Sequence, residues 1–181
     1  KYHLVEESRP GEYMPVTEDE NGINVYIGKE SEIDDDVAII KAKYYYNLVN
    51  VPCLCDDSGL CVEALDGAPG INSARYSGGK DKDNRDLLRK NLEGKFPAKA
   101  YFNCDLIYYD GKDIISTNGK IHGEIINEER GEDGFGYDSI FYYPPLSKTL
   151  AEISVDEKNK ISHRGHAIEE MLKKLQEKYN Y

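Results

Sequence analysis

The chain has 181 residues and 39% of them are hydrophobic, which is enough to bury a sizeable core in one domain and excludes a disordered chain. Its formal charge of −11 would repel a nucleic-acid backbone, so we expect no nucleic-acid partner, although an acidic protein can bind a polyphosphate through a divalent cation. The longest apolar runs fall far short of the roughly 20 residues that a membrane-spanning helix needs, so we expect a soluble protein without a membrane partner.

The first part of the chain predicts two short strands and one helix. Tyr2 to Val5 and Ile23 to Ile27 have the composition of strands, and the loop between them is rich in proline, glycine and acids. Asp34 to Val49 carries apolar residues at helical spacing, which predict one apolar face: Val37, Ile40, Tyr44 and Leu48. The aspartates at its start suit the positive end of the helix dipole.

A strand, a functional turn and a second strand are predicted next. Val51 to Cys55 and Leu60 to Leu65 are compact apolar runs, and the polar segment Asp56 to Gly59 lies between them. Gly67 to Gly70 then breaks the chain. Lys82 to Leu92 predicts a helix whose leucines lie on its inner face.

The second half of the chain predicts a long hairpin and a C-terminal helix. Ala100 to Tyr109 has the alternation of a strand, and Asp110-Gly111 is a hairpin turn signal that leads into a strand from Ile114. Ser162 is a predicted N-cap for the last helix, whose apolar stripe is Ile168, Met171, Leu172 and Leu175. Strands and helices in this order indicate an α/β or α+β domain.

The four cysteines are Cys53, Cys55, Cys61 and Cys104, and three of them lie in the stretch that predicts buried strand. None has the C-x-x-C spacing of a zinc site. We interpret them as reduced thiols that pack as small hydrophobic groups in a cytoplasmic protein. A metal-thiolate or disulfide role is the alternative.

Three clusters combine charge, glycine and aromatic residues, and the first contains the adjacent acids Asp56 and Asp57. Two carboxylates at the end of a buried strand repel each other and lose hydration, unless a cation or hydrogen-bond donors compensate them. A divalent metal is the simplest compensation. In the alternative interpretation, Asp57 only caps a turn at Ser58-Gly59.

The second cluster is Gly134-Phe135-Gly136-Tyr137-Asp138. Gly136 allows the backbone to approach a ligand closely, Phe135 or Tyr137 can stack on a base, and Asp138 can accept hydrogen bonds. The alternative is a glycine-rich turn that enters the following strand with its aromatic residues in the core.

The third cluster lies at the start of the last helix and contains Lys158, His163 and Arg164. Helix N-termini disfavour cations, so three basic residues gathered there indicate an anionic partner or a ligand with carbonyl groups. A surface charge cluster that pairs with Asp156 and Glu157 is the alternative.

In this order and at these separations, the clusters resemble the inosine triphosphate pyrophosphatase family, whose bacterial members carry D-D-S-G-L, G-G-A-P-G-x-x-S-A-R-Y, G-F-G-Y-D and S-H-R-G. The resemblance runs from about Ile39 to Leu175. It implies an α/β domain of α+β type over residues 1–181, with a central elongated mixed β-sheet flanked by helices, two lobes with an active-site cleft between them, and a homodimer.

The same resemblance implies an enzyme that hydrolyses noncanonical purine nucleoside triphosphates (ITP, dITP and XTP) to the monophosphate and pyrophosphate and so cleanses the nucleotide pool. Water would attack the α-phosphorus, and Mg²⁺, or Mn²⁺, would screen the phosphate charge.

Individual roles also follow from the resemblance. It implies that Asp57 is the general base and a metal ligand, that Asp56 supports it, and that Lys41 approaches the triphosphate. It assigns substrate contacts to Ser58, Phe135, Gly136, Tyr137, Asp138, Lys158, His163 and Arg164. Donors such as the last two would favour 6-oxo purines over adenine, which presents an amino donor at that position.

Two departures from the family pattern concern the N-terminal region. The family opens with a strand and a T-x-N-x-x-K phosphate loop, which Lys1 to Glu30 does not match, and the chain begins without Met. We therefore expect this loop in a segment that precedes the given sequence; a protein without it would be a nucleotide-binding module without turnover. Counting back from Lys41 places the family's metal-binding glutamate at Lys29, so the adjacent Glu30 is the expected ligand, with Glu32 and Asp36 as weaker substitutes.

Overall fold

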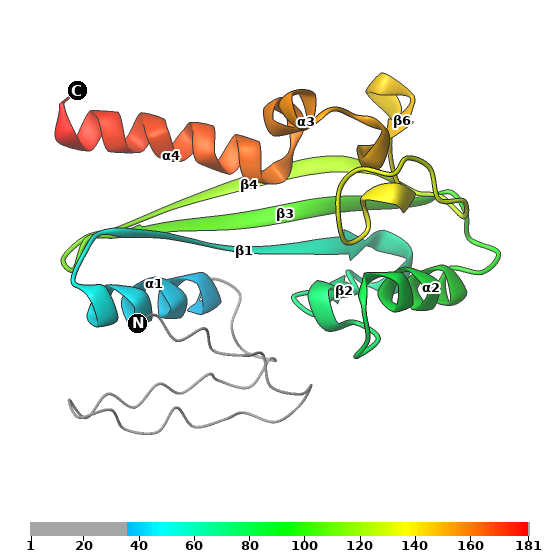
Figure 1. Ribbon diagram of the computed structural model, residues 1–181, viewed down its shortest axis with the longest axis horizontal. Helices are drawn as coiled ribbons and strands as arrows, with labels where there is room; N and C mark the ends of the chain where they lie inside the picture. The colour runs from blue at the N-terminus through cyan, green and yellow to red at the C-terminus, as the bar shows by residue number, and fades with distance from the viewer. Residues whose placement is uncertain (1–35, 181) are drawn as a thin grey trace.

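The computed structural model describes residues 36–180, which form one sheet with helices on both faces (Figure 1). The strand order is β2-β1-β3-β4-β5-β6. The strands are β1 (Cys53–Val62), β2 (Pro69–Gly70), β3 (Ala98–Tyr109), β4 (Ile114–Ile125), β5 (Phe141–Tyr143) and β6 (Lys148–Thr149). This confirms the α/β domain of α+β type. Each pairing between the described strands is antiparallel, so this part of the sheet holds no parallel pair of the kind that a mixed sheet has.

The helices are α1 (Asp36–Val49), α2 (Asp81–Asn91), α3 (Val155–Ile161) and α4 (His163–Tyr179). The first, second and fourth confirm predicted helices, and the predicted hairpin is confirmed as the β3–β4 pair. Within residues 36–180, no helix is long and apolar enough to cross a membrane. The strands predicted before residue 30 lie outside the described residues.

Helices α1 and α4 cover opposite faces of the long strands, below and above the sheet in Figure 1. Successive residues of a strand point to opposite faces. Accordingly, Cys104 and Leu106 of β3 pack with α4, whereas Ile107 packs with α1. We call these two sides of the sheet the α4 face and the α1 face.

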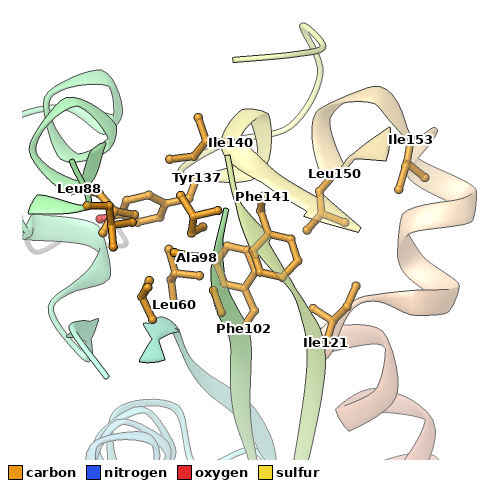
Figure 2. Close-up of a cluster of buried hydrophobic side chains, with 14 residues drawn as sticks. Leu60, Leu88, Ala98, Phe102, Ile121, Tyr137, Ile140, Phe141, Leu150 and Ile153 are labelled. Atoms are coloured by element: carbon orange, nitrogen blue, oxygen red, sulfur yellow. The ribbon is translucent and has the colours of Figure 1, made fainter. Parts of the chain in front are cut away.

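The main core lies on the α4 face, at the end of the sheet away from the hairpin (Figure 2). Leu60 of β1 pairs with Phe102 of β3, whose ring centroid lies 4.8 Å from that of Phe141 with the ring planes tilted by 41°. Leu88 reaches this core from α2. Each such fully buried side chain contributes about 1.5–3 kcal/mol. The core therefore fixes the second half of β1 and holds the neighbouring Asp56 to Gly59 segment in place.

The predicted turn at Asp56 to Gly59 is wrong, because β1 runs through it as one continuous strand. Its pairing with β3 is unbroken from Cys53 opposite Tyr109 to Val62 opposite Ala100. This long pairing outweighs the local turn preference of the polar residues and glycine. Gly59 is required for another reason: a Cβ there would lie 2.5 Å from the Gly70 carbonyl oxygen of β2.

The C-terminal helix confirms the predicted cap and corrects the predicted stripe. The Ser162 side chain accepts a 3.0 Å hydrogen bond from the Gly165 N–H. Met171 is buried, but Ile168 and Leu172 are 43% and 55% exposed. They border a cavity instead of the core, which a helical period alone does not reveal.

Candidate active site

A cavity of about 760 Å³ lies between the middle of β1, the segment Gly134–Asp138 and the start of α4. Its size is typical of small-molecule sites. Of the residues to which the resemblance assigns substrate binding, Lys41 does not border it, and the other eight do, namely Ser58, Phe135, Gly136, Tyr137, Asp138, Lys158, His163 and Arg164. The fold therefore gathers three separate sequence clusters around one space.

The segment Gly134–Asp138 presents one aromatic ring to the cavity and buries the other. Phe135 is 66% exposed, and the Lys158 ammonium lies 5.0 Å from its ring centroid. Tyr137 is buried in the core and donates a 2.8 Å hydrogen bond to the Ser73 carbonyl oxygen. Of the two proposed stacking residues, Phe135 is the one whose ring is exposed, whereas Tyr137 is 4% exposed.

Asp138 fixes this segment from within. Its Oδ2 accepts a 2.9 Å hydrogen bond from the Phe135 N–H and another from Lys158 Nζ. Both side chains of the ion pair are largely buried, so the pair is protected from solvent screening.

His163 is a buried, neutral imidazole at the first position of α4. Only 8% of it is exposed, and its ring stacks on Phe102 at 4.9 Å. Burial, followed by the positive charges of Arg164 and Lys158, lowers the pKa of His163 to about 4. Its buried Nδ1 has no hydrogen-bond partner within residues 36–180. An unpaired buried nitrogen beside a cavity indicates a ligand, a water or an ion.

Arg164 is bound by an acid from the first cluster. Its Nε and Nη2 donate to Asp56 Oδ2 at 3.0 and 2.7 Å, and Ser58 Oγ donates to the same oxygen at 3.1 Å. Burial alone would raise the pKa of Asp56, but the hydrogen bonds and charge of Arg164 outweigh it, so the pKa is lowered. Asp56 therefore supports Arg164, whereas the resemblance implied support for Asp57.

The cation cluster thus differs from the alternative interpretation, a surface cluster that pairs with Asp156 and Glu157. His163 is neutral, so it adds no charge at the helix N-terminus. Lys158 and Arg164 pair with Asp138 and Asp56, which are distant in the sequence, and not with Asp156 or Glu157. Sequence proximity identified the cations but gave the wrong partners.

Asp57 and Lys41 lie on the other side of β1. Asp57 is opposite Asp105 in the register, so it points to the α1 face, whereas Asp56 and Ser58 point to the α4 face. Lys41 of α1 donates a 3.0 Å hydrogen bond to Asp57 Oδ1. The structure therefore brings these two residues together but does not place them in the cavity.

The edge of β1 connects the two faces. Among the described strands, β2 pairs with β1 only at Leu60 and Cys61, so β1 is paired on one side alone from Cys53 to Gly59. A ligand that crosses this edge can reach Ser58 on one face and Asp57 on the other.

The expected metal ligands are only partly within the described residues. Glu30 and Glu32 lie outside them, and Asp36 is the first residue of α1. Residues 36–180 contain no group of three or more His, Cys, Asp or Glu side chains that could hold a metal. The single carboxylate of Asp57 still fits Mg²⁺, which commonly takes one or two protein carboxylates and completes its shell with water and substrate phosphates.

The cysteines form no such site either. All four are free thiols, and burial raises the pKa of Cys55 and of Cys104 to about 11. Both thiols are therefore protonated and weakly reactive at neutral pH.

Three residues that support the site had no assigned role in the sequence. Ser73 Oγ accepts a 2.8 Å hydrogen bond from the Leu60 N–H and donates to the Gly70 carbonyl oxygen, which joins the loop after β2 to β1. Asp81 and Arg85 of α2 bind the backbone of Gly136. Their four-residue spacing was visible, but it is equally typical of a solvated helix face.

An exposed aromatic ring, a ring nitrogen without a partner within residues 36–180 and a carboxylate–lysine pair across a strand edge make this region a candidate ligand site in an α+β domain. The profile of the Ham1 family matches residues 19–174. The chain belongs to the Ham1 family. The match begins well before Ile39, where the resemblance was expected to start.

Individual relatives agree with this assignment. The dITP/XTP pyrophosphatase of Desulfotalea psychrophila is 44% identical over 140 residues, which cover 76% of this chain and 63% of the relative, just under two thirds of its length. The dITP/XTP pyrophosphatase of Aquifex aeolicus is 38% identical over 189 residues, which cover 93% of this chain and 94% of the relative. The structure of the Staphylococcus aureus Ham1 protein has a TM-score of 0.77 and 37% identity, with 83% of this chain and 80% of that chain covered.

Proposed function

We propose that this protein is a hydrolase of acid anhydrides that converts ITP, dITP and XTP to the monophosphate and pyrophosphate, and so removes noncanonical purines from the nucleotide pool. The observation that carries the proposal is the cavity that joins the exposed ring of Phe135 to Nδ1 of His163, which has no hydrogen-bond partner within residues 36–180. This cavity lies beside an edge of β1 that no described strand pairs with from Cys53 to Gly59. The relatives named dITP/XTP pyrophosphatase support the substrate class.

Base selection follows from the donors at the cavity. A purine stacked on Phe135 would bring its 6-position toward the start of α4, where Arg164 carries only donors and neutral His163 carries one. A 6-oxo group accepts these hydrogen bonds. The 6-amino group of adenine would leave the donors unpaired, and this loss discriminates strongly between otherwise similar ligands.

The triphosphate would cross the edge of β1 that no described strand pairs with, toward Asp57 and Lys41. Asp57 would accept a proton from a water molecule as the water oxygen bonds to the α-phosphorus and the bond from that phosphorus to the bridging oxygen breaks, which releases pyrophosphate. The Lys41 ammonium, now 3.0 Å from Asp57, would balance charge on the phosphates. Asp57 and Glu30 would hold Mg²⁺ or Mn²⁺, and Glu32 or Asp36 would be the substitute for Glu30. When bound, the cation would screen the phosphate oxygens.

The cellular location and the oligomeric state of the protein are also proposals. A cytoplasmic location is supported by the four free cysteines, because thiols stay reduced in that compartment. A homodimer follows from the resemblance alone, and sedimentation of the purified protein would test it.

The direct test is product release from ITP, dITP, XTP, GTP and ATP with Mg²⁺. We expect pyrophosphate and the monophosphate from the first three at a kcat/KM at least about 100-fold above that for ATP. The 181-residue chain and the protein from the complete reading frame should be compared. Release of orthophosphate, or equal rates with ATP, would contradict the proposal, and binding of ITP without turnover by both proteins would favour the nucleotide-binding module.

A further inference from the structure

Helix α2 binds one residue of the Phe135 segment by both of its backbone groups. Asp81 Oδ2 accepts a 2.8 Å hydrogen bond from the Gly136 N–H, and Arg85 Nη1 donates a 2.8 Å hydrogen bond to the Gly136 carbonyl oxygen. The two side chains are four residues apart on α2, so they lie on the same face of the helix. We call this arrangement the α2 clamp.

The segment needs such a clamp because it has little apolar burial of its own at Phe135. That ring is mostly exposed, and the glycines on both sides of it have positive φ angles of 90° and 60°. Glycine loses more conformational entropy than any other residue when it is ordered. Polar contacts to the backbone must therefore set the direction of the Phe135 ring.

The Arg85 side chain of the α2 clamp is held in place by an ion pair. The Arg85 side chain is only 17% exposed, and its Nε donates a 3.2 Å hydrogen bond to Glu129 Oε2. Arg89 contacts the other oxygen of Glu129 at 3.2 Å. Leu88, between these arginines in the sequence, is fully buried in the main core. The position of Gly136 is therefore tied to the core through α2.

We infer that Asp81 and Arg85 are positioning residues for base recognition: they hold Gly136, and through it the Phe135 ring, in the orientation that stacks on the purine. This inference rests on the proposed function, since it places the base on Phe135. Asp81 also borders the cavity, so a direct contact between its charge and the substrate is the competing role.

The test compares KM and kcat for pyrophosphate release from ITP in four variants. Asp81→Ala and Arg85→Ala should each raise KM about tenfold, or about 1.4 kcal/mol, with little change in kcat. Asp81→Asn should recover most of this loss, because an amide oxygen can still accept from the Gly136 N–H. Lys82→Ala is the matched control, since Lys82 lies on the same helix, is exposed and pairs with Asp86. Thermal unfolding of each variant checks that the fold is retained.

A second comparison separates positioning from direct contact. In a Phe135→Ala background, Asp81→Ala should have almost no further effect on KM, because the ring that it positions is gone. Additive effects would overturn the inference, as would an Asp81→Asn variant as impaired as Asp81→Ala. If the wild-type protein released no pyrophosphate, the proposed function would fail separately, and the same cycle measured on ITP binding would still decide the role of the clamp.

Discussion

Replacing His163 should remove a specific part of the pH dependence of stability. The folded protein holds the pKa of His163 at about 4, mainly because the ring is buried, against an ordinary value of 6.5. Between these values the unfolded chain binds a proton that the folded chain does not, so stability falls as the pH falls through this window. His163→Phe should abolish this contribution and keep a ring on Phe102.

The size of the effect follows from the same two pKa values. The full contribution is about 3 kcal/mol, and about 2 kcal/mol of it should be lost between pH 7.5 and pH 5. The lower end of that interval lies close to the isoelectric point of about 4.9, so dilute protein is needed to limit association at low net charge.

Urea unfolding at several pH values measures this contribution. The free energy of unfolding of the wild-type protein should fall more steeply toward pH 5 than that of His163→Phe, and the difference between the slopes isolates the residue. His122→Gln, which changes an exposed histidine on another element, is the control for loss of a histidine in general. Parallel curves for the wild-type protein and His163→Phe would refute the claim that His163 is buried and neutral.

Two further predictions concern β1. Asp56→Asn and Arg164→Ala should each reduce the preference for ITP over ATP. The double variant should be no worse than Arg164→Ala, because Asp56 acts through the Arg164 guanidinium that it holds. Additive losses in kcat/KM would contradict this prediction. Gly59→Ala should destabilise the fold by about 1–3 kcal/mol, because its Cβ would overlap the Gly70 carbonyl oxygen, and an unchanged melting temperature would show that β2 can move away.

Local patterns in the sequence were sufficient to predict the helices and strands that bury one continuous row of apolar side chains. Helix α2 and the β3–β4 hairpin were predicted because their periodicity and turn residues agree with their tertiary surroundings. Helix α1 was also predicted, but its apolar face was wrong: Ala38 and Ala42 are its buried residues, whereas Leu48 of the predicted stripe Val37, Ile40, Tyr44 and Leu48 is 52% exposed. The turn predicted at Asp56 to Gly59 is absent because the local turn preference of these residues conflicts with their tertiary surroundings. Four turn-forming residues are held in a strand only because β3 pairs along their whole length.

The site was predicted as a set of residues but not as a set of contacts. The sequence indicated Asp56, Arg164, Asp138 and Lys158, yet the pairing of the first two spans 108 positions and depends on how α4 lies over β1. Ile168 and Leu172 show the same limit, because a helical stripe does not reveal that part of the helix borders a cavity. The opposite directions of Asp56 and Asp57 became clear only when β1 proved to be continuous.

The central claim is that Asp57 accepts the proton of the attacking water on the α1 face while the base is held on the α4 face. Turnover and binding of ITP by Asp57→Asn, measured with the protein from the complete reading frame and saturating Mg²⁺, test this claim most directly. We expect pyrophosphate release to fall by about 10²–10⁴-fold, while the affinity for ITP falls far less, since Phe135 and His163 are untouched. Unchanged turnover in Asp57→Asn would contradict the account.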